Sequence, residues 1–147
     1  MNIWQFQSTL TRRLLVWSIL SIVFGTLLQV PEDRFARGLG KQIAAWGFID
    51  ALIAIFGNQF AKNRAARQPD PLAAQIVQDE RDKLSKLLWV NTGLDVGYTT
   101  GGSVLALTKG KTDPGWRGHG IGIIIQGAFL FIFDLYHSIK LGLRTGV

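Results

Sequence analysis

The sequence contains no cysteine and only two histidines among its 147 residues. The lack of cysteine excludes disulfides, thiolate zinc sites, iron–sulfur clusters and cysteine nucleophiles. Charged residues are also scarce: they make up 18% of this chain, whereas about 25% is usual in soluble proteins. The length suffices for one domain, and Lys and Arg outnumber Asp and Glu by 16 to 10. This composition argues against a soluble domain, because the apolar residues are concentrated in blocks.

Four apolar blocks of membrane-spanning length are separated by the charged residues. They cover residues 14–30, 42–60, 87–107 and 118–141. A bilayer core about 30 Å thick needs roughly 20 apolar residues in a helix, and backbone groups in lipid must be satisfied internally. The first block is too long for a signal peptide, and no small-x-small cleavage site follows it. Because short links favour antiparallel packing, the sequence predicts an all-α, single-domain, four-helix transmembrane bundle with up-down topology.

The basic residues predict the orientation of this bundle. With four spans, the N-terminus, the second connection and the C-terminus share one side. That side carries ten of the basic residues and the other side six, which places both termini in the cytoplasm by the positive-inside rule. We therefore expect a multi-pass protein of the cell inner membrane. The ten are Arg12, Arg13, Lys62, Arg64, Arg67, Arg81, Lys83, Lys86, Lys140 and Arg144.

Two segments outside the spans are expected to be helical. Asp70 and Pro71 have the pattern of an N-cap followed by proline at the first helical position, so a cytoplasmic extension over residues 72–86 is predicted to lead into the third span. Its charged run, residues 79–83, is expected to be a solvated face. Near the N-terminus, apolar residues at positions 3, 6 and 10 share one helical face, which predicts a short helix lying on the cytoplasmic leaflet.

Three carboxylates lie within three different spans, and they are the most informative feature of the sequence. Asp50, Asp95 and Asp134 fall at similar predicted depth, in the inner half of the bilayer. An Asp at the centre of a membrane helix costs roughly 2.5–3.5 kcal/mol on insertion scales, and such residues usually face the bundle interior. We expect at least one of them to be protonated, or to be opposed by His137 or a bound cation.

Helical periodicity extends this prediction to neighbouring polar residues. At 100° per residue, Asn91, Asp95 and Tyr98 form one stripe on the third span. On the fourth span, Gln126, Asp134 and His137 share a face. These residues are the candidate ligand- or ion-binding site. The alternative is a purely structural network of hydrogen bonds, each contributing about 0.6 kcal/mol on average in membranes.

Glycines at four-residue intervals predict close helix packing. Gly93, Gly97 and Gly101 repeat on the third span, and Gly118 and Gly122 begin the fourth. Such motifs let another helix approach closely. The pattern leaves open whether the partner helix belongs to the same chain, so a homo-oligomer or a larger membrane complex remains possible.

Several other sequence features resemble binding motifs but lack residues or spacing that those motifs require. Gly110-Lys111-Thr112 resembles the end of a Walker A motif, but the required glycine is replaced by Leu105. His119 and His137 are predicted at opposite ends of one span, so they cannot together hold a metal or haem. The basic residues flank spans, which favours anionic lipid over nucleic acid as their partner. No cofactor, metal site or catalytic residue is assigned.

Two stretches of the sequence resemble a family of small, uncharacterised bacterial four-helix integral membrane proteins. One consists of residues 46–50 (WGFID) with residues 89–98 (WVNTGLDVGY), and the other runs from residues 117–120 (RGHG) to residues 126–134 (QGAFLFIFD). The resemblance covers spans two to four. It implies a fold and a membrane location but supplies no activity.

Two functions are carried forward from these observations. The first is a small proton- or cation-coupled carrier, or a small-ligand binding protein, that uses the intramembrane carboxylates. The second is a non-catalytic assembly or scaffold subunit of a larger membrane complex. A membrane-embedded enzyme acting on lipid has weaker support, which is limited to the basic outer loop.

Overall fold

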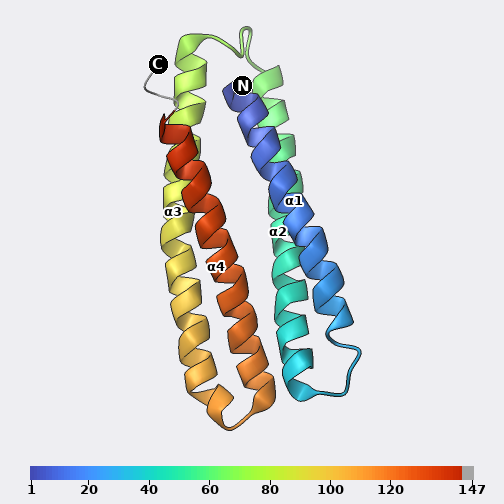
Figure 1. Cartoon of the computed structure of the whole chain (residues 1–147). Coiled ribbons are helices and arrows are strands. Elements are labelled where there is room, and N and C mark those ends of the chain that lie inside the picture. Colours follow the sequence, from blue (N-terminus) through green and yellow to red (C-terminus); the bar gives the residue numbers. More distant parts are fainter. Residues whose placement is uncertain (144–147) are drawn as a thin grey trace.

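The computed structural model describes residues 1–143, which form four long helices and no strand. The elements are α1 (Ile3–Leu27), α2 (Arg34–Ala66), α3 (Ala74–Leu107), the short 3-10 helix η1 (Lys109–Lys111) and α4 (Pro114–Gly142). Successive long helices run in opposite directions, so the N-terminus, the 67–73 connection and the end of α4 lie at one end of the bundle (Figure 1). The predicted all-α up-down bundle is confirmed; Arg144 lies outside the described residues.

Side-chain caps explain where three of the helices begin. Asn2 and Gln5 form a capping box at the start of α1, and Asp33 accepts a hydrogen bond from the Ala36 backbone N–H at the start of α2. Asp113 caps α4, with Pro114 as its first residue. These oxygens satisfy backbone donors that have no partner within the helix.

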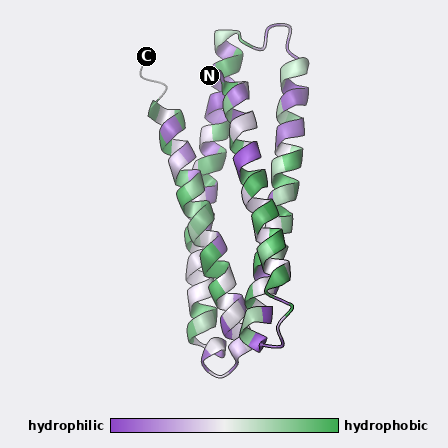
Figure 2. Cartoon of the chain, turned by 45° about the vertical axis from the view of Figure 1, so that its right-hand side comes forward, coloured by the Kyte–Doolittle hydropathy of each residue, from purple (hydrophilic) through white to green (hydrophobic). Residues whose placement is uncertain are grey.

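Three helices, α1, α2 and α4, are long and apolar enough to cross a membrane. Helix α3 falls short of this standard because Asn91, Asp95 and several Thr, Ser and Gly residues dilute its apolar character. Figure 2 shows hydrophobic residues along the middle of the bundle and hydrophilic ones toward its ends.

Two expectations about the helix starts are wrong. The N-terminal residues do not form a separate helix lying across the bundle, because they are the first turns of α1 and bury Ile3, Phe6 and Leu10 in the core. Asp70 does not cap α3: that helix has Ala73 at its N-cap, and the Asp70 carboxylate instead accepts from Leu72 N–H in the connection. The helical extension itself is present, because α3 begins well before residue 87.

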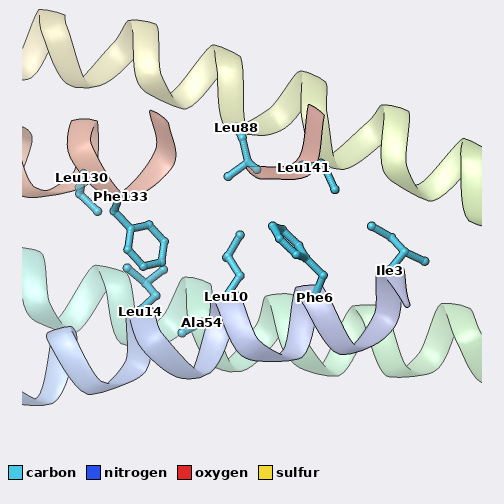
Figure 3. Packing of buried hydrophobic residues seen from close by; sticks show 9 residues of the cluster. All are labelled: Ile3, Phe6, Leu10, Leu14, Ala54, Leu88, Leu130, Phe133 and Leu141. Carbon is cyan, nitrogen blue, oxygen red and sulfur yellow. The ribbon is translucent and has the colours of Figure 1, made fainter. Parts of the chain in front are cut away.

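Glycines hold the helices close together toward the end of the bundle opposite the termini. A Cβ at Gly118 would collide with the backbone of Phe35 in α2, and one at Gly120 would lie 2.8 Å from the Gly102 carbonyl oxygen of α3. Toward the other end, larger side chains project into the space between the pair α1–α2 and the pair α3–α4 (Figure 3). This core consists of Ile3, Phe6, Leu10, Leu14, Ala54, Leu88, Leu130, Phe133 and Leu141.

Candidate functional site

The three carboxylates from α2, α3 and α4 meet inside the bundle. Asp50, Asp95 and Asp134 are 1%, 3% and 7% exposed, and all three line one cavity of about 770 Å³. Each sits on the inward stripe of its helix, where 3.6-residue periodicity places it. The structure thus brings together three residues that are spread over more than 80 positions of the sequence.

Within this cluster, all three acids interact electrostatically with one another. Asp134 also interacts with the Asn91 side chain. Among the described residues, Asp50 Oδ2 and Asp95 Oδ2 have no hydrogen-bond partner. A buried charge without a partner is strongly disfavoured. The cluster therefore needs a proton or a cation to complete it.

The walls of the cavity are mostly apolar and partly aromatic. Tyr98 and Asn91 line it on α3, as their shared stripe with Asp95 predicts. The Tyr98 ring meets the Trp46 ring of α2 edge-on, with 4.9 Å between centroids. Aliphatic side chains such as Ile53 and Leu94 complete the walls.

A polar network lines the cavity at the end where the N-terminus lies. Arg64 Nε donates to both carboxylate oxygens of Glu80 at 3.1 Å, and Arg64 Nη2 donates to Glu80 Oε2 at 2.9 Å. Gln7 of α1 bonds weakly to both residues at 3.4 Å, and Lys83 Nζ lies 3.5 Å from Glu80 Oε1. Arg64 and Lys83 are the two basic residues that line the cavity, and both face Glu80.

The expectation that residues 79–83 form a solvated face is wrong for Glu80, which is only 5% exposed. Burial raises the pKa of Glu80, but the hydrogen bonds from Arg64 and Gln7 and the charges of Arg64 and Lys83 outweigh it. The pKa of this carboxyl therefore lies below its ordinary value.

Gln126 lies apart from the carboxylates and joins α4 to α1. It is 1% exposed; its Oε1 accepts from Trp17 Nε1 at 2.9 Å and its Nε2 donates to Ser21 Oγ at 3.1 Å. Trp17 also stacks on Phe129, with 3.6 Å between ring centroids. This geometry favours the structural interpretation for Gln126.

We expect Gln126→Leu to destabilise the bundle by roughly 1–2 kcal/mol, because it leaves the Trp17 N–H without an acceptor. Unfolding of the purified protein, followed by tryptophan fluorescence, measures this change. Because Gln126 does not line the cavity, the affinity of the carboxylate cluster for protons or cations should stay as in the unsubstituted chain. If the variant instead loses affinity for protons or cations while its stability is unchanged, Gln126 belongs to the binding site.

His137 is likewise turned away from the carboxylates. Its Nδ1 donates to the Phe133 carbonyl oxygen at 2.7 Å, which leaves Nε2 facing Arg13 Nη1 of α1 at 3.5 Å. The ring also packs edge-on against Phe6. His137 therefore contributes to the α1–α4 interface.

The predicted glycine stripes divide into two groups. Gly118 and Gly122 pack against α2, as expected for close helix contact. A Cβ at Gly93, Gly97 or Gly101 would have nothing within 4 Å among the described residues. This stripe on α3 faces outward, and it makes no close contact with another helix of residues 1–143.

Sequence reasoning missed Trp17 and the network of Gln7, Arg64 and Glu80. Gln7 could have been found, because it falls on the same α1 face as Ile3 and Leu10. Arg64 and Glu80 resembled ordinary charges beyond the spans, and nothing in their spacing pairs them.

Across residues 1–143, no group of three or more His, Cys, Asp or Glu side chains is arranged to hold a metal ion.

Comparison with known proteins yields one match. A family model described as "Family of unknown function (DUF6992)" matches residues 13–135. The match includes residues 13–27 of α1, a helix that the resemblance seen in the sequence left out. No curated protein and no solved structure matches the chain.

Proposed function

Because the chain belongs to the DUF6992 family, whose function is unknown, we propose a function from the geometry of the site. The protein is an integral membrane protein that binds protons or a small cationic ligand at Asp50, Asp95 and Asp134, as a small carrier or a ligand-binding protein. We place it in the cell inner membrane, with the end that carries the N-terminus in the cytoplasm.

The outer surface of the helices supports the membrane location. Large apolar side chains such as Phe24, Phe60 and Ile132 are 60%, 58% and 66% exposed. Such a surface suits acyl chains rather than water. Helix α3 is compatible with lipid despite its lower hydropathy, because the hydroxyl groups of Thr92 and Thr100 donate to carbonyl oxygens four residues earlier.

The convergence of three buried carboxylates on one cavity is the observation that carries the proposal. A structural network would pair each carboxylate oxygen, whereas Asp50 Oδ2 and Asp95 Oδ2 have no partner among the described residues. Ionisable groups inside a membrane domain commonly mark ion or substrate pathways.

Dicyclohexylcarbodiimide, an apolar reagent that adds to protonated carboxyl groups, tests the proposal. We expect it to form a stable acylurea on at least one of the three aspartates in the full-length protein in lipid, and to do so more slowly as the pH rises. Cations that enter the cluster should protect these positions. Proteolysis and mass spectrometry locate the modified residues.

The control lies in the same digest: Asp79 is exposed on α3, so its reaction reports an ordinary water-facing carboxylate. Asp50→Asn, Asp95→Asn and Asp134→Asn should each remove labelling at the changed position. Labelling of the cluster no greater than that of Asp79 at every pH would contradict the proposal.

The scaffold function remains the second candidate, supported by the outward-facing stripe of Gly93, Gly97 and Gly101 on α3. In this case a helix from another copy or another protein packs on the stripe. Native mass spectrometry from mild detergent should then show a stable assembly that Gly97→Leu disrupts. A monomer that retains no partner argues against it.

A further inference from the structure

The cavity that holds the carboxylates reaches the outer surface of the bundle between α2 and α3. Three of the side chains that line it are also exposed: Ile53 on α2 is 55% exposed, and Leu94 and Tyr98 on α3 are 51% and 40% exposed. Helices α2 and α3 do not pack closely on one another, since α2 packs on α1 and α4, and α3 packs on α4. The space between them is bordered by side chains rather than by a close backbone crossing.

At the end of the bundle near the N-terminus, charged side chains border the cavity. The Arg64–Glu80 ion pair links α2 to α3 there, and Gln7 of α1 braces both side chains. A solute arriving from water at that end meets this network first. The open approach to the carboxylates therefore runs sideways, across an apolar border.

The interior of the cavity combines carboxylate oxygens with apolar walls. Asp50 and Asp95 each present a carboxylate oxygen without a hydrogen-bond partner among the described residues. Trp46, Tyr98 and aliphatic side chains surround them. Calcium and magnesium ions prefer six or more oxygen ligands, and among the described residues no group of three or more His, Cys, Asp or Glu side chains is arranged to hold a metal ion. An aromatic and aliphatic wall with an anionic base suits a cation that carries its own apolar body.

The size of the cavity agrees with such a ligand. Its volume of about 770 Å³ lies within the range of roughly 300–1,000 Å³ that holds drug-sized molecules. A proton or a hydrated ammonium ion would leave most of this space empty.

We propose that the cavity binds a lipophilic organic monocation, which enters from the surrounding lipid between α2 and α3 and places its charge at Asp50 and Asp95. This inference rests on the proposed function, because it names the class of cation that the carboxylate cluster accepts.

Tetraphenylphosphonium and tetraphenylborate form a matched pair of probes, because they share size and shape but differ in the sign of charge. With the full-length protein in lipid nanodiscs and empty nanodiscs as background, we expect saturable binding of the phosphonium alone. Asp50→Asn should weaken it at least tenfold, and Asp95→Asn, with the same expected loss, provides a second variant should Asp50→Asn fail to fold. Equal binding of both probes, or no saturable binding of the phosphonium, would overturn the inference.

The route of entry has its own test. Leu94→Trp places a bulky ring at the border of the cavity, whereas Val96→Trp adds the same ring to an exposed position on α3 outside the lining. We expect only Leu94→Trp to slow the association of the phosphonium, severalfold or more. Equal association rates in the two variants would exclude entry between α2 and α3.

The labelling experiment separates failure of this inference from failure of the proposed function. If the carbodiimide modifies the cluster but tetraphenylphosphonium neither binds nor protects it, the ligand is a proton or a small hydrophilic cation, and the lipophilic class is wrong. If the aspartates are not preferentially modified, the proposed function fails as well.

Discussion

Gly118→Ala is expected to destabilise the bundle by about 3 kcal/mol, the upper end of the usual range for overpacked positions. The added methyl group would collide with the Phe35 carbonyl and would lie 2.8 Å from the Leu39 backbone nitrogen. Both contacts are backbone atoms of α2, so no rotamer change can relieve them. The crossing of α2 and α4 must widen instead. Thermal or SDS-induced unfolding of the purified protein measures the loss.

Gly97→Ala is the matched control for this prediction. Both substitutions add one methyl group to a helical glycine, but a Cβ at Gly97 meets no atom within 4 Å among the described residues. Alanine has the higher helix propensity, by about 0.8–1 kcal/mol, so the control should be neutral or slightly stabilising. Similar losses for both variants would show that α2 and α4 do not cross closely at Gly118.

Arg64→Gln is expected to have the second-largest effect on stability, because it leaves the Glu80 carboxylate buried without its main partner. Removing one member of a fully buried pair costs about 3–5 kcal/mol. The Arg64 side chain is 44% exposed, so water can replace part of the interaction, and we expect a loss of about 1–3 kcal/mol. The double variant Arg64→Gln with Glu80→Gln should recover much of it, as unfolding of both variants will show.

The same pair predicts a pH dependence of stability. Because the pKa of Glu80 is lower in the folded chain than its ordinary value of 4.5, its ionised form stabilises the fold above pH 4.5. This contribution is lost as the pH falls through the lowered pKa. Glu80→Gln should remove this part of the acid sensitivity. If the variant has the same pH profile as the unsubstituted chain, the ion pair does not contribute to stability.

The sequence alone predicted the helices and the inward position of the three aspartates, because both depend on the 3.6-residue period. It could not predict which neighbour each inward residue meets. Gln126 and Asp134 lie about 80° apart around α4, and this angle separates the contact with α1 from the cavity. His137 was assigned to the site by the same one-face argument, yet it faces Arg13. Pairing between helices depends on their crossing geometry, which periodicity does not contain.

The length of the central helices also has a consequence for where a ligand comes from. Helix α2 has 33 residues, so it is about 50 Å long, against about 30 Å for the hydrocarbon layer. The cavity extends from Trp46 on α2 and Tyr98 on α3 toward Glu80 at the end that carries the N-terminus. In the proposed membrane orientation, we therefore expect it to open mainly toward the leaflet on that side. If the proposed function holds, amphiphiles dissolved in that leaflet reach the cavity directly, whereas those in the opposite leaflet must first flip across.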